Sequence, residues 1–206
     1  GGPAMQAKFD RPANVELAPN GDLLVVDEGN NRIRRINRLT GIITSVVGDG
    51  KFEFNGDGIP ANQAGIILPT GFSSPGLAIS STGNMFFADR GNQRVRMVTA
   101  NTGLISTFAG GGGTGNGGLA TSAVMVVPSV VGFDIDGGVI ICDRGNNQIR
   151  RVDAATGITT PYVGTGIAGF SGDGGPALDA RLAMPLYSAF DRYYNLYISD
   201  QFNQVI

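Results

Sequence analysis

Short apolar runs that end in an acidic residue dominate the pattern of hydrophobic and polar positions along this chain. In the first of them, four apolar residues at 23–26 lead to Asp27, and the turn before them contains Asn20-Gly21. A run of this length bounded by turn residues is typical of a strand covered on both faces, and Asn-Gly is a strong signal for a tight hairpin. The pattern therefore predicts short β-strands joined by tight turns.

The same pattern recurs along the chain. The aspartates that end the runs lie at positions 27, 89, 143 and 200, so their spacings are 62, 54 and 57 residues (27 to 89, 89 to 143, 143 to 200). Within the first unit we expect four strands, at residues 14–18, 22–27, 32–37 and 42–47. Four short strands repeated at this period are typical of the blades of a β-propeller.

We therefore predict an all-β fold, a β-propeller of four-stranded antiparallel blades. Three full blades are expected near residues 12–48, 69–110 and 128–164, and part of a fourth at 185–206. Because stacked blades cover both faces of their second strands, five side chains or their immediate strand neighbours are predicted to be buried: Leu24, Val26, Phe86, Ile140 and Ile198. The lone Cys142 lies in such a run and is expected to be a buried thiol.

The predicted blades do not close a ring, because a propeller has at least four of them. Residues 1–10 resemble a connection between blades, since Gly1–Ala4 match Gly174–Ala177, and they are poor strand formers. The last blade is expected to stop at Ile206, inside its third strand, and to leave an open edge. We expect a continuation of the polypeptide or a neighbouring subunit to complete that sheet.

The repeated sequence also resembles a known family. Its pattern is Gly-Asn, four residues, Asp, two residues, Asn, and then Ile-Arg-Arg-Val and Thr-Gly-x-Ile-Thr-Thr, with Gly169-Phe-Ser-Gly-Asp-Gly-Gly-Pro-Ala177 between repeats. This is similar to NHL-repeat β-propellers with long glycine-rich loops, whereas WD40 arrays are disfavoured because the chain has no Trp and no His. The resemblance implies an extracellular or cell-surface scaffold, non-enzymatic, that binds a protein or glycan partner through loops at one rim.

An enzymatic alternative stays open. NHL-like lyases and propeller lactonases resemble this fold and use a metal in the channel together with histidines. This chain has no His and one Cys, which excludes Ser-His-Asp catalysis, Cys-His catalysis and a His/Cys zinc site within it. A lyase or lactonase-like hydrolase would therefore need catalytic residues outside this segment, and the sequence favours the scaffold without deciding the question.

An acidic and a basic residue recur together in the repeats. The pairs are Asp27 with Arg34, Asp89 with Arg96 and Asp143 with Arg150, and Asp200 continues the series. They could act as acid and electrophile around a channel, but an active site needs to occur only once, and structural ion pairs often mimic such sites. We interpret them as a structural motif in which each arginine lies near the carboxylate of its own or the adjacent blade.

The sequence predicts no cofactor. Asp57 and Asp173 lie in Gly-Asp-Gly turns that resemble half of a calcium loop, but the alternating carboxylates and the distal Glu are missing. A β-turn in which Asp bonds its own backbone accounts for both. The glycine run at 110–118 lacks the Lys-Ser/Thr ending of a phosphate loop.

Charge and hydropathy restrict the partners. The chain has 15 Lys and Arg against 17 Asp and Glu, a net charge of −2, which gives no broad cationic surface. We therefore expect no nucleic-acid partner, because such binding relies on neutralising phosphates. No apolar run approaches the length of a membrane-spanning helix, so no membrane insertion is expected.

Overall fold

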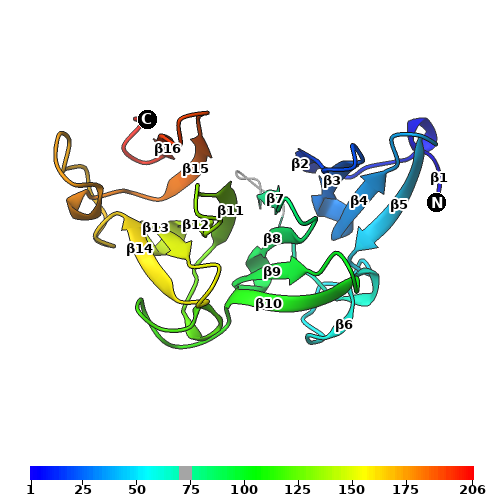
Figure 1. The fold of residues 1–206 in the computed structure, drawn as a ribbon, viewed down its shortest axis with the longest axis horizontal. Helices are drawn as coiled ribbons and strands as arrows, with labels where there is room; N and C mark the ends of the chain where they lie inside the picture. The colour runs from blue at the N-terminus through cyan, green and yellow to red at the C-terminus, as the bar shows by residue number, and fades with distance from the viewer. Residues whose placement is uncertain (70–75) are drawn as a thin grey trace.

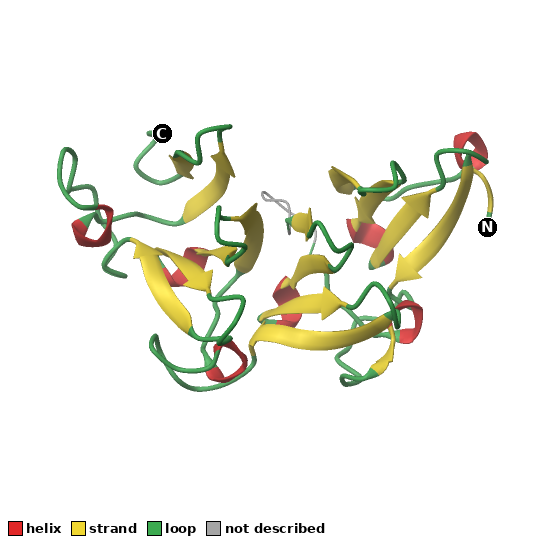
Figure 2. Ribbon diagram, in the orientation of Figure 1, coloured by secondary structure: helices red, strands yellow, loops and turns green. Residues whose placement is uncertain are grey.

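The computed structural model describes residues 1–69 and 76–206, and its strands form antiparallel sheets set in an arc (Figure 1). Strands and loops make up most of this part of the chain, with single-turn 3-10 helices between them (Figure 2). The sheets follow one another in chain order, so each is one blade of a propeller. The predicted all-β fold is confirmed.

Each complete blade runs from an inner strand, near the middle of the arc, to an outer strand. The first blade consists of β2 (Pro12–Leu17), β3 (Leu23–Asp27), β4 (Arg32–Ile36) and β5 (Ile42–Val47). The second consists of β7 (Leu77–Ile79), β8 (Met85–Asp89), β9 (Arg94–Val98) and β10 (Leu104–Gly110). The third consists of β11 (Pro128–Phe133), β12 (Val139–Asp143), β13 (Gln148–Val152) and β14 (Thr159–Val163). The predicted start of the second blade at residue 69 adjoins 70–75, which lie outside the described residues.

A 3-10 turn joins the second strand to the third in every complete blade: η2 (Glu28–Asn30), η4 (Arg90–Asn92) and η6 (Arg144–Asn146). The residue after each turn has a left-handed backbone, with φ of 47° at Asn31, 54° at Gln93 and 52° at Asn147. Asn adopts this conformation more readily than most residues. The connections between blades contain further turns: η1 (Ala4–Gln6), η3 (Ala61–Gln63), η5 (Ala120–Ser122) and η7 (Ala177–Asp179).

All three complete blades contain the four predicted strands, and in the first two blades a two-residue edge strand adds a fifth. The fifth strand comes from the preceding connection: β1 (Gly2–Pro3) pairs with β5, and β6 (Ile59–Pro60) pairs with β10. The connection runs along the free edge of the outer strand before it turns inward, and it thereby satisfies backbone groups of that edge. Residues 1–10 therefore include a short strand, which belongs to the first blade and not to the last.

The fourth sheet contains two strands, β15 (Pro185–Phe190) and β16 (Leu196–Asp200). The expected third strand is reduced to one bridge between Asp200 and Val205, because residues 201–204 form a turn. Apolar side chains are exposed on this sheet, Tyr197 and Val205 among them, and Val15 and Leu17 are exposed on the first blade. The two end blades thus present apolar surface to solvent.

The core consists of apolar layers between adjacent blades. Of the five side chains predicted to be buried, four are: Leu24, Val26, Phe86 and Ile140. Ile198 is half-buried because its two-stranded sheet shields it less, although it packs in the layer between the third and fourth blades. Cys142 is fully buried, and this desolvation raises the pKa of its thiol to about 12.

Candidate functional site

The recurring aspartates lie at the ends of the second strands, where each accepts a hydrogen bond from the incoming connection. The donors are backbone N–H groups: Asp10 to Asp27 at 2.8 Å, Ile67 to Asp89 at 2.8 Å, Val126 to Asp143 at 2.8 Å and Ala183 to Asp200 at 2.7 Å. Each carboxylate also accepts from the Asn side chain three residues later, which is residue 30, 92, 146 or 203. The backbone bonds therefore fasten each connection to its blade, and the Asn bonds stabilise the turn that follows the second strand.

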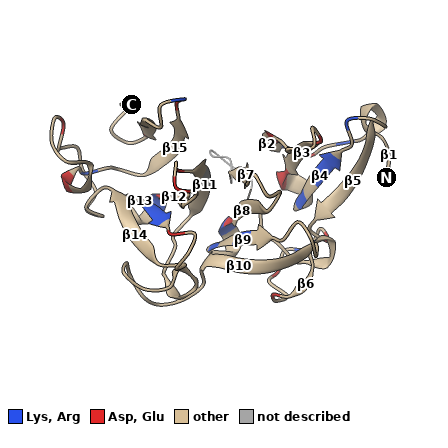
Figure 3. Ribbon diagram, in the orientation of Figure 1, with Lys and Arg blue, Asp and Glu red and all other residues tan. Residues whose placement is uncertain are grey.

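The structure brings each predicted arginine to the aspartate of its own blade. The ion pairs are Arg34 with Asp27 at 3.4 Å, Arg96 with Asp89 at 3.2 Å and Arg150 with Asp143 at 3.0 Å. Figure 3 shows basic residues on β4, β9 and β13, the third strands of the three complete blades. Arg96 and Asp89 have no solvent exposure.

Burial raises the pKa of the Asp89 and Asp143 carboxyl groups, while the donated hydrogen bonds and the neighbouring arginine oppose that rise. Because partners surround these carboxylates and the arrangement repeats from blade to blade, they offer little to a substrate. The geometry favours their interpretation as structural fastenings.

The two calcium candidates have different surroundings. Asp57 accepts from Nη2 of Arg96 at 2.7 Å and from the hydroxyl of Thr107 at 3.2 Å, so its carboxylate already has a cationic partner. Asp173 is exposed on the connection before the fourth blade. Within residues 1–69 and 76–206, no three His, Cys, Asp or Glu side chains cluster as metal ligands would.

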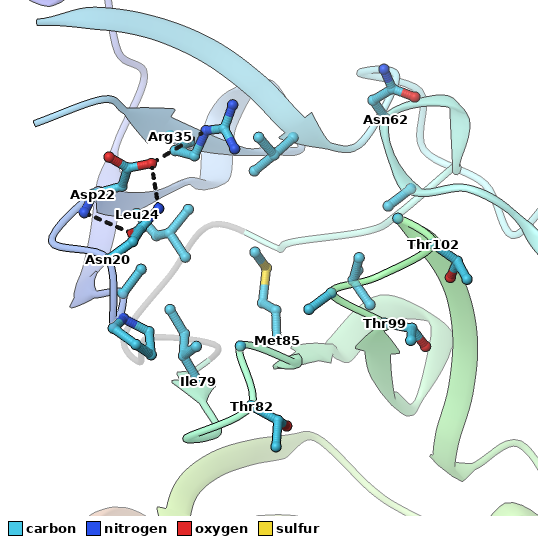
Figure 4. A pocket seen from close by; sticks show the side chains of 18 of the residues that line it. Asn20, Asp22, Leu24, Arg35, Asn62, Ile79, Thr82, Met85, Thr99 and Thr102 are labelled. Atoms are coloured by element: carbon cyan, nitrogen blue, oxygen red, sulfur yellow. Dashed lines mark hydrogen bonds and ion pairs between the residues drawn. The ribbon is translucent and has the colours of Figure 1, made fainter. Parts of the chain in front are cut away.

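A cleft of about 920 Å³ lies between the first and second blades. Its walls come from the turn at 18–22, the facing strands of both blades and the turns at 80–84 and 99–103. Figure 4 shows Leu24 and Met85 extending into the space between the blades, with Asp22 and Arg35 on one side and Thr102 on the other. The volume is in the range of ligand-binding pockets.

The cleft is open because the first pair of blades lacks aromatic rings that fill the next pair. Between the second and third blades, the ring of Phe86 packs edge-on against Phe108 at 4.9 Å and against Phe133 at 5.5 Å between ring centroids. In the first pair of blades, the strand registers place Leu24 at the position of Phe86, Val46 at that of Phe108 and Ile79 at that of Phe133. Three aliphatic side chains therefore stand where the chain elsewhere uses three phenyl rings.

The rim of the cleft is polar. It carries neutral hydroxyl and amide groups: Asn20, Thr44, Ser45, Asn62, Ser81, Thr82, Thr99 and Thr102. Among the described residues at the rim, an ion pair joins Nε of Arg35 to Asp22 at 3.8 Å. Asp22 is buried and also accepts from the Asn20 side chain at 3.1 Å and from the Arg38 backbone at 3.0 Å, whereas the Arg35 side chain is 48% exposed.

None of these cleft residues was predicted from the sequence to be functional. The repeated residue types, Asp and Arg, drew attention first, and in the structure they are bonded within each blade. The available signal was a difference between repeats: three residues before the motif aspartate, the first unit has Leu24 and the second has Phe86. Such a difference changes packing between blades without changing the motif.

Comparison with known proteins supports the propeller. No family model matches the chain. The chloroplastic protein SUPPRESSOR OF QUENCHING 1 of Arabidopsis thaliana is 25% identical over 209 residues, which cover 96% of this chain and 19% of that protein. An auxiliary nutrient binding protein from Bacteroides thetaiotaomicron superposes with a TM-score of 0.64 and 19% identity, covering 92% of this chain and 45% of that one.

Virginiamycin B lyase from Staphylococcus aureus superposes with a TM-score of 0.54 and 16% identity, covering 95% of this chain and 50% of the lyase. At these identities the likeness shows the fold alone. The chain spans half or less of the length of these solved structures and about a fifth of the curated relative. No helix in the described part of the chain combines the length and hydrophobicity that crossing a membrane requires.

Proposed function

We propose that this chain belongs to a non-enzymatic binding propeller of the NHL type, whose ligand enters the cleft between the first two blades from the rim. The cleft itself carries this proposal: an aliphatic floor below a rim of hydroxyl and amide groups is the usual composition of a recognition pocket. The repeated aspartates support the non-enzymatic choice, because fastening the blades already occupies them.

We propose a protein as the partner. A pocket with an apolar floor and a polar rim receives an anchor side chain in many protein interfaces, and the surrounding turns at 18–22 and 80–84 provide a rim that excludes water. An extracellular or cell-surface location is part of the proposal and rests on the resemblance of the repeats to long-loop NHL proteins. A glycan partner is the competing outcome of the test below.

We also propose that the exposed apolar faces of the end blades pack against further blades of the same propeller. Val15 and Leu17 on the first blade and Tyr197 on the fourth are exposed, whereas their counterparts in the interior lie between two sheets. Covering such faces removes apolar area from water, which favours association.

The enzymatic alternative draws its support from the likeness to the lyase propeller. Within this chain the buried acid of the cleft, Asp22, already accepts hydrogen bonds from Asn20 and Arg38. A lyase or hydrolase that uses this propeller would therefore draw its acid, base and metal ligands from elsewhere in a larger protein.

Filling the cleft tests the proposal. Leu24→Phe together with Val46→Phe gives the first blade the rings that the second blade has at these positions, so the double variant should fold. Peptides selected from a random displayed library on the unmodified protein should bind this variant at least about tenfold more weakly, because an anchor pocket is worth roughly 2 kcal/mol or more. Binding is measured by calorimetry.

Leu39→Phe is the control, because it replaces a leucine by phenylalanine at an exposed position outside the cleft. It should bind the selected peptides as the unmodified protein does. Equal peptide binding by the filled and unfilled proteins would contradict the proposal. So would a glycan array that gives binding on both proteins while no peptide is selected, or mass spectrometry that finds the bound ligand converted.

A further inference from the structure

We infer that the cleft accepts an aromatic ring that carries a carboxylate, as found in a peptide whose last residue is Phe or Tyr. The inference rests on the proposed function and names the chemistry of the ligand at the same site. It combines two features of the cleft: an apolar space at the position where phenyl rings lie in the next pair of blades, and an arginine at its edge that has guanidinium donors to spare.

The place for the ring follows from the equivalence of the two blade pairs. Leu24 and Phe86 occupy equivalent positions, because each pairs with the third strand of its blade in the same register. Val46 and Phe108 are also equivalent, because each lies at the bulge of the outer strand. Between the second and third blades the backbone thus accommodates interlocking rings at this depth. The same space between the first two blades can take a ring from a ligand.

The lining of that space favours an aromatic group over an aliphatic one. Met85 extends into the cleft beside Leu24 and Ile79 (Figure 4). A thioether sulfur makes favourable contacts with the edge of an aromatic ring, and its flexible chain adapts to the shape of a ligand. A ring held here would also contact Val98 on the same blade.

The positive charge that would bind the ligand carboxylate belongs to Arg35. Strand registers make Arg35 equivalent to Met97 in the second blade and to Arg151 in the third. Arg151 pairs with two acids, Asp134 and Asp153. In the part of the chain that the structure describes, Asp22 is the single acid within ion-pair distance of Arg35, and the two groups are 3.8 Å apart.

A guanidinium presents five N–H donors in a planar fork and binds a carboxylate through two of them. Asp22 contacts Arg35 at Nε, which leaves the two Nη groups for a second carboxylate on the solvent side. Asp22 itself is buried and accepts hydrogen bonds from the Asn20 side chain and from the Arg38 backbone, so its negative charge has a fixed position beside the guanidinium. A ligand carboxylate at the rim would complete an arrangement like the doubly paired Arg151.

Small probes test this chemistry directly. We would measure the affinity of 3-phenylpropionate, 3-phenylpropionamide and 3-cyclohexylpropionate by calorimetry, and follow the methionine methyl groups by NMR. Ring-current shifts should appear at Met85, which lines the cleft, and not at Met125, which is buried between the second and third blades. The phenyl carboxylate should bind about tenfold or more tightly than the amide, because a charge-assisted bond is lost in the latter.

Two variants test the carboxylate site and the ring site separately. Arg35→Met copies the second blade, so it should fold, and it should weaken 3-phenylpropionate about tenfold while leaving the amide unchanged. Leu24→Phe with Val46→Phe should abolish binding of both. Equal affinity for the cyclohexyl probe would overturn the aromatic part, and an unchanged affinity in Arg35→Met would overturn the carboxylate part. Selected peptides that need an open cleft but not Arg35 would leave the proposed function standing and refute this inference alone.

Discussion

Replacing Asp89 by Ala should lower the free energy of unfolding by about 3–5 kcal/mol, the usual result of removing one partner of a buried ion pair. The carboxylate accepts from the Ile67 backbone, from the Asn92 side chain and from Arg96, and both charged groups are fully buried. Without it, the buried guanidinium of Arg96 would keep one ion-pair partner within the described chain, Asp57, whose side chain is 42% exposed, and its hydrogen bond to the Gly56 carbonyl. Urea unfolding followed by circular dichroism measures the change.

Asp200→Ala provides the matched control, because Asp200 accepts the same two kinds of hydrogen bond, from the Ala183 backbone and the Asn203 side chain. Within the described residues, no arginine forms an ion pair with it. It should cost about 1–3 kcal/mol, the range for a lost buried hydrogen-bond acceptor. If both variants lost equal stability, the ion pair would contribute nothing and the fastening role of the arginines would be wrong.

Gly110→Ala should lower the free energy of unfolding by about 2–5 kcal/mol. Gly110 ends β10 with φ of 88°, and a left-handed backbone costs a residue with a Cβ roughly 1–2 kcal/mol. A Cβ at this position would also overlap the carbonyl oxygen of Gln93, so the backbone would have to move, which costs roughly 1–3 kcal/mol more. Thermal and urea unfolding measure the loss.

Gly113→Ala serves as the control for this prediction. Gly113 lies three residues further along the same connection, its φ is not positive, and nothing lies within 4 Å of an added Cβ. The free energy of unfolding of this variant should stay within about 0.5 kcal/mol of that of the unmodified protein, as for most surface substitutions. A Gly110→Ala variant as stable as Gly113→Ala would show that the close approach of β10 to Gln93 is not required.

The repeats made the blades predictable from sequence. Runs such as Val139–Asp143 combine an apolar core strand with the aspartate that closes it, so one pattern identified both the strand and its buried contacts. The aspartate and arginine were found for the same reason. The edge strand β1 was missed because Gly2-Pro3 has low strand propensity, and its pairing comes from the free edge of β5 rather than from its own residues.

The cleft could not be predicted from the sequence pattern, for a different reason. Leu24, Val46 and Ile79 are ordinary core residues by type, and nothing in their own sequence marks an open space. The cleft forms because these three aliphatic side chains fill less space between the first two blades than the phenyl rings fill between the second and third. Local sequence determines a strand, whereas a cavity depends on how facing side chains fill the space between two sheets.

A crystal structure of the protein soaked with 3-phenylpropionate tests the central claim most directly, namely that the cleft between the first two blades is the ligand site. We predict electron density for the ring beside Leu24 and Met85 with the carboxylate at Arg35, and none between the second and third blades, where Phe86 and Phe108 fill the space. Density for the probe on the inner strands or at the connections, with the cleft left unchanged, would contradict it.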